Sequence, residues 1–141
     1  MPDTFSGPAR VEFAPYQRGF PTRVRVLEPL TFGPITVPEG FVSDGASIPR
    51  IAWRLIGPPF DDRWIRSALV HDIRCSFRVG TWQETAAMFD ACMALEGNDG
   101  ARRRWMVRAV RWFGPRWPAW QAITVEQLAE ITKTHLFDWS L

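Results

Sequence analysis

Hydrophobic and polar positions alternate in the first third of the chain. In Thr22-Arg23-Val24-Arg25-Val26 polar and apolar residues alternate, which is the pattern of a strand with one buried face. Two further β-prone runs, Val11–Phe13 and Ile35–Val37, lie on either side of it. Prolines and glycines separate the three runs and keep the strands short. The pattern predicts a small antiparallel sheet within residues 1–45.

The pattern becomes helical after the Gly57-Pro58-Pro59 breaker. Its period predicts helices ending near Phe77, Glu96 and Phe113, and a short helix after Thr124. Asp61 or Asp62 is the expected N-cap of the first, and capping-box spacings begin at Thr81 and Thr124. We therefore expect one α+β domain over residues 1–141. Residues 1–45 are mainly β and turns, and residues 46–141 are mainly helical, with three to four helices packed on the sheet.

The first of these helices carries two polar residues where apolar ones are expected. On a helical wheel Asp72 lies inside the apolar arc and His71 at its edge. The opposite arc is expected to face water, and it holds Arg63, Arg66, Ser67, Arg74 and Arg78. A buried carboxylate needs hydrogen bonds, a cation, a metal or a proton. Asp72 is therefore either a structural staple for a nearby loop or part of an active site.

A suitable loop precedes this helix. Asp44 and Ser47 flank Gly45, and Ser47 stands just before Ile48-Pro49, where a short helical stretch can begin. As a structural element, the loop uses Asp44 and Ser47 as turn and cap residues. As an active site, it places them beside His71 and Asp72.

The catalytic interpretation assigns His71 as the general base, because its pKa is nearest neutrality. Asp44 or Asp72 would orient the ring, and Ser47 or loop N–H groups would hold an anionic intermediate of ester, amide or glycosidic hydrolysis. A metal interpretation uses His71, Asp72 and Asp44 as ligands for a divalent ion such as zinc, manganese or iron. A divalent metal is not favoured, because the other histidine, His135, lies far along the chain.

Composition limits the function classes. The net charge is +2, and no apolar run reaches the ~20 residues of a membrane span. The first residues lack the layout of a signal peptide, so synthesis and folding in a cytosol are expected. Cys75 and Cys92 are expected to be buried thiols rather than a disulfide framework.

The third predicted helix is rich in arginine. Arg104, Arg108 and Arg111 share one face, and Trp105, Ala109 and Trp112 are expected to form the buried one. Such a face is either simply solvated or binds an anionic partner, whether nucleic acid or an acidic protein surface. The aromatics of segments 117–120 and 137–139 either complete the core or form a docking patch.

The motif Gly-Phe-x-Ser-Asp-Gly-Ala-Ser-x-Pro at residues 40–49, followed by His71-Asp72 on a helix, resembles the domain of unknown function numbered 1353. That family is frequent in tailed phages, prophages and gene-transfer elements. The resemblance implies a phage-encoded accessory protein, made in the host cytoplasm, that joins other virion or assembly proteins. The alternative is a small hydrolase of a bacterial envelope component, peptidoglycan or lipid. Members often carry an aspartate where this chain has Ala86.

Overall fold

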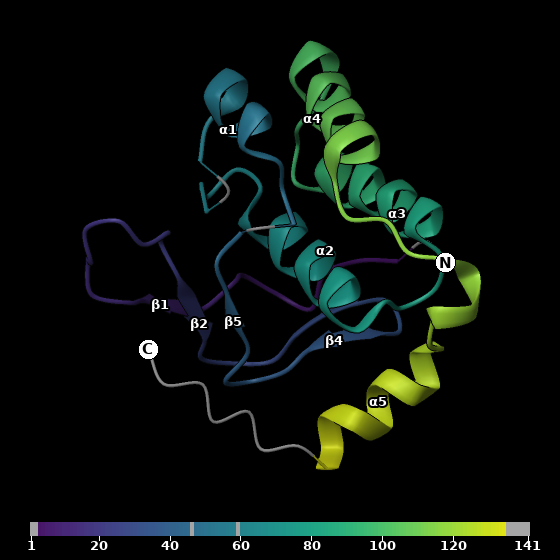
Figure 1. Cartoon of the computed structure of the whole chain (residues 1–141). Helices are drawn as coiled ribbons and strands as arrows, with labels where there is room; N and C mark the ends of the chain where they lie inside the picture. The colour runs from purple at the N-terminus through teal and green to yellow at the C-terminus, as the bar shows by residue number, and fades with distance from the viewer. Residues whose placement is uncertain (1–2, 46, 59, 135–141) are drawn as a thin grey trace.

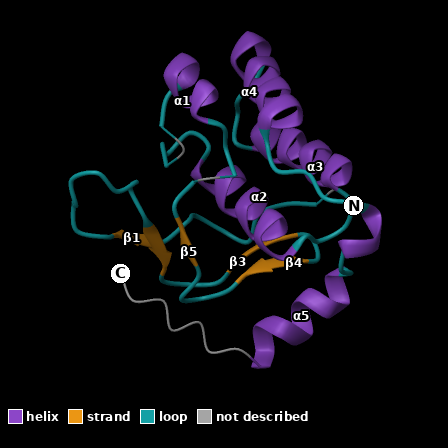
Figure 2. Cartoon of the chain, in the orientation of Figure 1, coloured by secondary structure: helices purple, strands orange, loops and turns teal. Residues whose placement is uncertain are grey.

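The computed structural model describes residues 3–45, 47–58 and 60–134 and confirms the α+β fold. Strands occupy the first part of the chain and helices the rest, as Figure 2 shows. The strands are β1 (Val11–Phe13), β2 (Val24–Val26), β3 (Leu30–Phe32), β4 (Ile35–Val37) and β5 (Val42–Ser43). The helices are α1 (Arg50–Ile56), α2 (Ile65–Phe77), α3 (Trp82–Leu95), α4 (Gly100–Phe113), the 3-10 helix η1 (Ala119–Gln121) and α5 (Val125–Thr134).

The strands form two small antiparallel units. β2 lies between β1 and β5, and β3 and β4 form a separate hairpin. The alternation around Val24 and Val26 has the expected result, because both valines are buried and Arg25 between them is not. The sequence missed β3 and β5. β3 follows a proline directly, and β5 has only 2 residues, too few to show a period.

Helix α2 is the centre of the fold. It packs on β3 and β4 on one side and on α3 on the other, while α4 contacts both α3 and α1 (Figure 1). α5 lies apart from the other helices and contacts β4. The described chain thus has five α-helices, more than the expected three to four, because the short stretch after Ser47 forms α1.

Two clusters of buried apolar side chains make up the core. The first joins the strands to α2 and α5 and contains Val24, Ile35, Leu69, Ile73 and Leu128. The second joins α1, α3 and α4 and contains Ile48, Ala52, Phe89, Met93 and Met106. Both clusters draw on residues around α2, since Trp64 at its start belongs to the second.

The helix caps expected at Thr81 and Thr124 are present. The cap expected at Ser47 or Asp44 was wrong, because α1 begins after Pro49 without a side-chain cap and Ser47 Oγ lies against His71 instead. Thr81 Oγ1 accepts from Glu84 N–H at 3.0 Å at the start of α3. Before α5, Thr124 and Gln127 exchange hydrogen bonds of 2.7 and 3.1 Å in a reciprocal capping box. The cap expected for α2 was wrong, because the Asp61 carboxylate instead accepts from the backbone and guanidinium of Arg63.

The faces of α2 and α4 that are exposed to water differ in part from those that the sequence predicts. Ser67 and Arg74 of α2 are buried, because α3 covers that side of the helix and supplies their polar partners. In α4, Trp105 and Trp112 are 54% and 63% exposed, although a buried position was expected. The buried face of α4 lies one residue further round the helix and consists of Met106, Val107, Ala109 and Val110.

The segment after α4 returns to the core. Trp117 is buried, and its indole N–H donates to the carbonyl of Gly80 at 2.8 Å. Trp120 is 81% exposed, so the aromatics of this segment are divided between core and surface. His135 and segment 137–139 lie outside the described residues. Among the described helices, none combines the length and apolar character needed to cross a bilayer.

Candidate functional site

The predicted polar residues meet where the loop after β5 touches α2. Ser43 ends β5, and the chain turns at Gly45, whose φ of 71° favours glycine. The turn is closed by a 3.0 Å hydrogen bond from Ile48 N–H to the carbonyl of Gly45, after which α1 begins. This turn brings Ser47 against the middle of α2, where His71 and Asp72 are buried.

The carboxyl group of Asp72 faces two serine hydroxyls, one from β5 and one from the loop. The hydroxyls of Ser43 and Ser47 favour its ionised form and so act against the rise of its pKa. The Ser43 hydroxyl oxygen also accepts from Gly45 N–H at 3.2 Å, which fixes the turn. Asp72 of α2 therefore lies where Ser43 of β5 and Ser47 of the loop act on its carboxyl group.

His71 completes the network through its two ring nitrogens. Nδ1 lies 3.1 Å from Ser47 Oγ, and the sulfur of Cys75, one turn later, lies 3.8 Å from Nδ1 and 3.7 Å from Nε2. When the Ser47 hydroxyl donates its proton to Asp72, its oxygen accepts from Nδ1–H of a neutral imidazole. Nε2 is then free to accept from the thiol of Cys75. The ring also packs on Phe89 of α3, with centroids 5.0 Å apart.

Burial shifts the pKa of each of these groups in the direction that favours its uncharged form. Burial, aided by the charge of Arg74, lowers the pKa of His71 from 6.5 to about 3. Burial also raises the pKa of Asp72 from 3.8 to about 6, against the opposing effect of the two serine hydroxyls. The Cys75 thiol has its pKa raised by burial to about 12, so it stays protonated at neutral pH.

Asp44 lies at the edge of this cluster rather than inside it. It is half-buried, and its charge contributes to the raised pKa of Asp72. Asp44 lines a cavity of about 320 Å³ together with Phe13, Thr22, Trp53, Pro58 and Phe60. A neighbouring cleft of about 570 Å³ shares Trp53 and Pro58 with it. Neither His71 nor Asp72 lines either of these spaces.

The cluster thus contains three of the four predicted residues, Ser47, His71 and Asp72, with Asp44 at its edge. Ser43 and Cys75 also belong to it, and the sequence analysis missed both as site residues. Ser43 stands directly before Asp44, and its hydroxyl points inward because β5 alternates. Cys75 follows His71 by four residues, the helical spacing at which side chains meet. Across the described ranges, no three His, Cys, Asp or Glu side chains gather as metal ligands do.

The predicted arginine face of α4 is separate from this cluster. Arg104, Arg108 and Arg111 are all exposed. The Arg108 guanidinium lies 5.9 Å from the ring centroid of Trp105. Within the described chain none of these three arginines forms an ion pair, whereas Arg103 on the adjoining face pairs with Asp90 of α3 at 2.9 Å.

Residues 24–110 match the family model described as protein of unknown function DUF1353. The chain belongs to this family. The matched residues run from β2 through most of α4 and include every member of the polar cluster. The DUF1353 match ends before Arg111 and does not include η1 or α5.

Two relatives come from Sinorhizobium fredii (strain NBRC 101917 / NGR234). Its uncharacterized protein y4iH is 40% identical over 75 residues, which are 53% of this chain and 31% of that protein. Its uncharacterized protein y4jT is 36% identical over 81 residues, 57% of this chain and 24% of that protein. The chain thus covers less than a third of either relative. No solved structure matches this chain.

Proposed function

We propose that this chain is a non-catalytic accessory protein of a tailed phage or prophage, which acts by binding other proteins of the particle or of its assembly. In this proposal Ser43, Ser47, His71 and Asp72 hold the fold together and do not react. The phage origin rests on the likeness of the 40–49 loop and the His71-Asp72 pair to the DUF1353 pattern. Synthesis in the host cytoplasm and later incorporation into the particle belong to the same proposal.

The burial of His71 is the observation that supports a non-catalytic role. His71 is 2% exposed, and its ring nitrogens face Ser47 and Cys75. A general base has to come within hydrogen-bond distance of the proton that it removes, directly or through one water. A buried neutral imidazole with a pKa near 3 is also a weak base. Ala86, where related sequences often carry an acid, is buried among apolar side chains and adds no proton donor.

His71→Ala tests this role. Wild type and variant are incubated with bacterial envelope fractions, and released fragments are measured by mass spectrometry. We expect no release by either protein, and a free energy of unfolding lower by about 2 kcal/mol in the variant, because the Ser47 and Cys75 contacts are lost. Release by wild type alone would reject the proposal and identify the bond that is cut.

A second candidate is the small hydrolase of an envelope component. It is favoured by Asp44, which lines the 320 Å³ cavity close to Asp72, a carboxyl group with a pKa of about 6. Two carboxyl groups in different environments can divide acid and base roles. For His71 to act as base, the loop at residues 44–49 would have to move away from α2. The envelope experiment distinguishes this candidate from the first.

The exposed face of α4 is the docking surface in the proposed function, and its partner is an acidic protein surface. Trp105 and Trp112 project beside Arg104, Arg108 and Arg111, which have no counter-ion among the described residues. Tryptophan and arginine are the residue types that contribute most to protein interfaces. An acidic surface complements the charge of this face, and the rings supply apolar contact.

Binding to poly-L-glutamate and to a labelled single-stranded oligothymidine tests the docking surface. We expect poly-L-glutamate to bind, and Arg104→Ala/Arg108→Ala to weaken it roughly tenfold, because two charge pairs are lost. Arg10→Ala/Arg18→Ala removes the same charge from exposed positions outside α4 and should leave this binding unchanged. Preference for the oligonucleotide, lost in Trp105→Ala, would instead assign this face to nucleic acid.

A further inference from the structure

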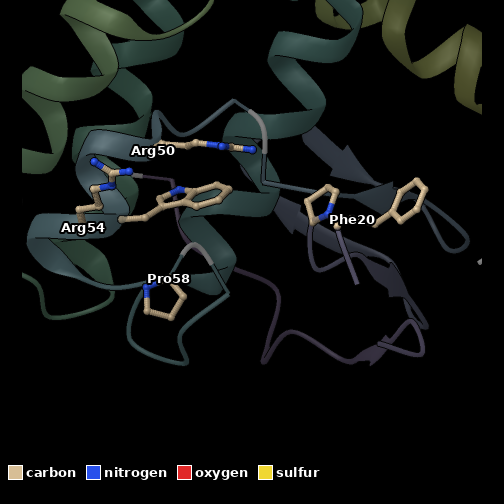
Figure 3. Close-up of a pocket in the computed structure, with 7 residues that line it drawn as sticks. Phe20, Arg50, Arg54 and Pro58 are labelled. Carbon is tan, nitrogen blue, oxygen red and sulfur yellow. The ribbon is translucent and has the colours of Figure 1, made fainter. Parts of the chain in front are cut away.

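A cleft of about 570 Å³ lies beside α1, away from the buried polar cluster. It is formed by the turn Gly19-Phe20-Pro21, the exposed side of α1 and Pro58 after the helix, as the close-up in Figure 3 shows. Arg50 and Arg54 project from α1 on one side, and Phe20 stands on the opposite side. The volume lies within the ~300–1,000 Å³ range of small-molecule sites.

The two arginines of the cleft have no ion-pair partner among the residues that the structure describes. Arg50 and Arg54 are four positions apart in sequence. Their Cα atoms therefore lie about 6 Å apart along the axis of α1, on the same face of the helix. In the described ranges neither guanidinium forms an ion pair, whereas Arg10, Arg25 and Arg66 each pair with a glutamate. An oxyanion in the cleft can form charge-assisted hydrogen bonds with these guanidinium groups.

The rest of the cleft is apolar. Phe20 is 67% exposed, and Pro21, Pro58 and the ring of Trp53 complete the lining. An aromatic or acyl group placed on these side chains is removed from water while its anionic end reaches the arginines. The lining therefore fits a ligand with a charged head and an apolar body better than a simple inorganic anion.

Trp53 supplies an independent observation. Its indole N–H is buried without a hydrogen-bond partner among the described residues. The buried indoles of Trp64 and Trp117 both donate to backbone carbonyls, at 2.7 and 2.8 Å. A buried donor without an acceptor is costly and calls for an explanation. Trp53 also lines the 320 Å³ cavity, which gives its ring room to turn toward an acceptor in the cleft.

We propose that the cleft formed by α1 and the Gly19–Pro21 turn binds a small amphipathic oxyanion. Arg50 and Arg54 hold the carboxylate or phosphate head, and the rings of Trp53 and Phe20 hold the aromatic or acyl body. The Trp53 indole N–H donates to the bound ligand. The site is independent of the docking face on α4, which lies on a different helix.

Nuclear magnetic resonance of the indole N–H groups tests this proposal. The resonance of Trp53 is identified by its disappearance in Trp53→Phe. The probes are 3-phenylpropionate, phenyl phosphate and the uncharged 3-phenylpropionamide. We expect a saturable downfield shift of the Trp53 resonance with at least one of the two anions. The uncharged amide should bind roughly tenfold more weakly, because it cannot form charge-assisted hydrogen bonds with the arginines.

Matched variants separate specific binding from general attraction to a basic protein. Arg50→Ala/Arg54→Ala should weaken anion binding roughly tenfold or more, while Arg104→Ala/Arg108→Ala, with the same loss of charge, should not. Both pairs are exposed, so folding is preserved and is checked by circular dichroism. An unshifted Trp53 resonance, equal binding of the amide, or equal weakening in both double variants would overturn the proposal. The relative affinity of the two anions identifies the head group.

Discussion

At the scale of single residues, the positions of protons determine the behaviour of the polar cluster. Asp72 holds its proton to higher pH in the folded chain than in the unfolded chain, because burial raises its pKa from 3.8 to about 6. His71 favours its neutral form, because burial lowers its pKa from 6.5 to about 3. The stability contributed by Asp72 is complete below pH 3.8 and is lost as pH rises through 6. That contributed by His71 is complete above pH 6.5 and is lost as pH falls toward 3.

The two residues change the free energy of unfolding in opposite directions as pH changes. Between about pH 4 and 6.5 their contributions should therefore largely cancel. In His71→Asn, Asp72 is the member of the pair that still titrates, so the free energy of unfolding relative to the double variant should rise as pH falls through this range. In Asp72→Asn, His71 is the member that still titrates, so this relative free energy should fall. Each change amounts to roughly 2–3 kcal/mol between pH 6.5 and 4. Urea unfolding at a series of pH values measures both slopes.

The double variant His71→Asn/Asp72→Asn is the reference for this measurement. It retains every other titrating group, including Asp61, whose carboxyl pKa is held well below its usual range by Arg63. Subtracting its stability at each pH leaves the contribution of the remaining residue alone. If the free energy of unfolding depends on pH in the same way in both single variants and in the double variant, the pKa values of His71 and Asp72 are not shifted in the folded chain.

The sequence was sufficient to find Asp72 and His71, because a helical wheel places a charged residue inside an apolar arc. It was not sufficient to place Arg74. The guanidinium of Arg74 donates to Thr85 Oγ1 and to the carbonyl of Val79 at 3.2 and 2.9 Å, partners on α3 and in the α2–α3 turn. An arginine whose partners come from another element looks like any surface arginine on a wheel.

At the scale of elements, the start of α2 is capped from a distance. Glu96, which follows α3, accepts from the backbone N–H and the hydroxyl of Ser67 in the first turn of α2, at 2.7 and 2.5 Å. Arg66 pairs with the other carboxylate oxygen at 3.2 Å. A negative charge at a helix N-terminus is favourable, so one side chain both caps α2 and attaches α3 to it.

This contact predicts a specific cost for changing Glu96. Glu96→Gln keeps one acceptor oxygen but loses the charge, and it should lower the free energy of unfolding by about 1–2 kcal/mol. Glu96→Ala leaves the Ser67 N–H and hydroxyl without partners and should cost about 2–3 kcal/mol. Glu39→Gln, at an exposed turn, should change stability by less than about 0.5 kcal/mol. Thermal and urea unfolding measure all three. Equal effects of Glu39→Gln and Glu96→Gln would contradict the proposed cap.

Caps were predictable from sequence only when they were local. The capping residues of α3 and α5 lie within three residues of the N–H groups that they bind, so spacing alone identified Thr81 and Thr124. Glu96 lies 29 residues after Ser67, and no spacing rule connects them. The short strands β3 and β5 were missed for the related reason that their pairing partners determine them more than their own residues do.

At the scale of the whole molecule, two apolar clusters share one central helix. The first cluster extends to Leu128 of α5, beyond the end of the DUF1353 match at residue 110. A parallel bridge between Val79 and Ile123 attaches this later segment to the end of α2. Residues outside the family match therefore contribute to the core inside it. The sequence predicts one domain over residues 1–141, and that prediction can be tested through these two clusters.

The single-domain prediction can be tested by mutating one residue in each cluster. Leu128→Ala in the first cluster and Met106→Ala in the second should each lower the free energy of unfolding by about 2–4 kcal/mol, because each creates a cavity in a packed core. If the molecule unfolds as one unit, both variants should shift the same transition, with the denaturant slope unchanged. Circular dichroism and tryptophan fluorescence should then give coincident curves. Leu95→Ala, at a site 48% exposed, is the control and should have a much smaller effect. Two separate transitions, each shifted by one variant only, would mean that α2 does not couple the clusters and that the chain contains two folding units.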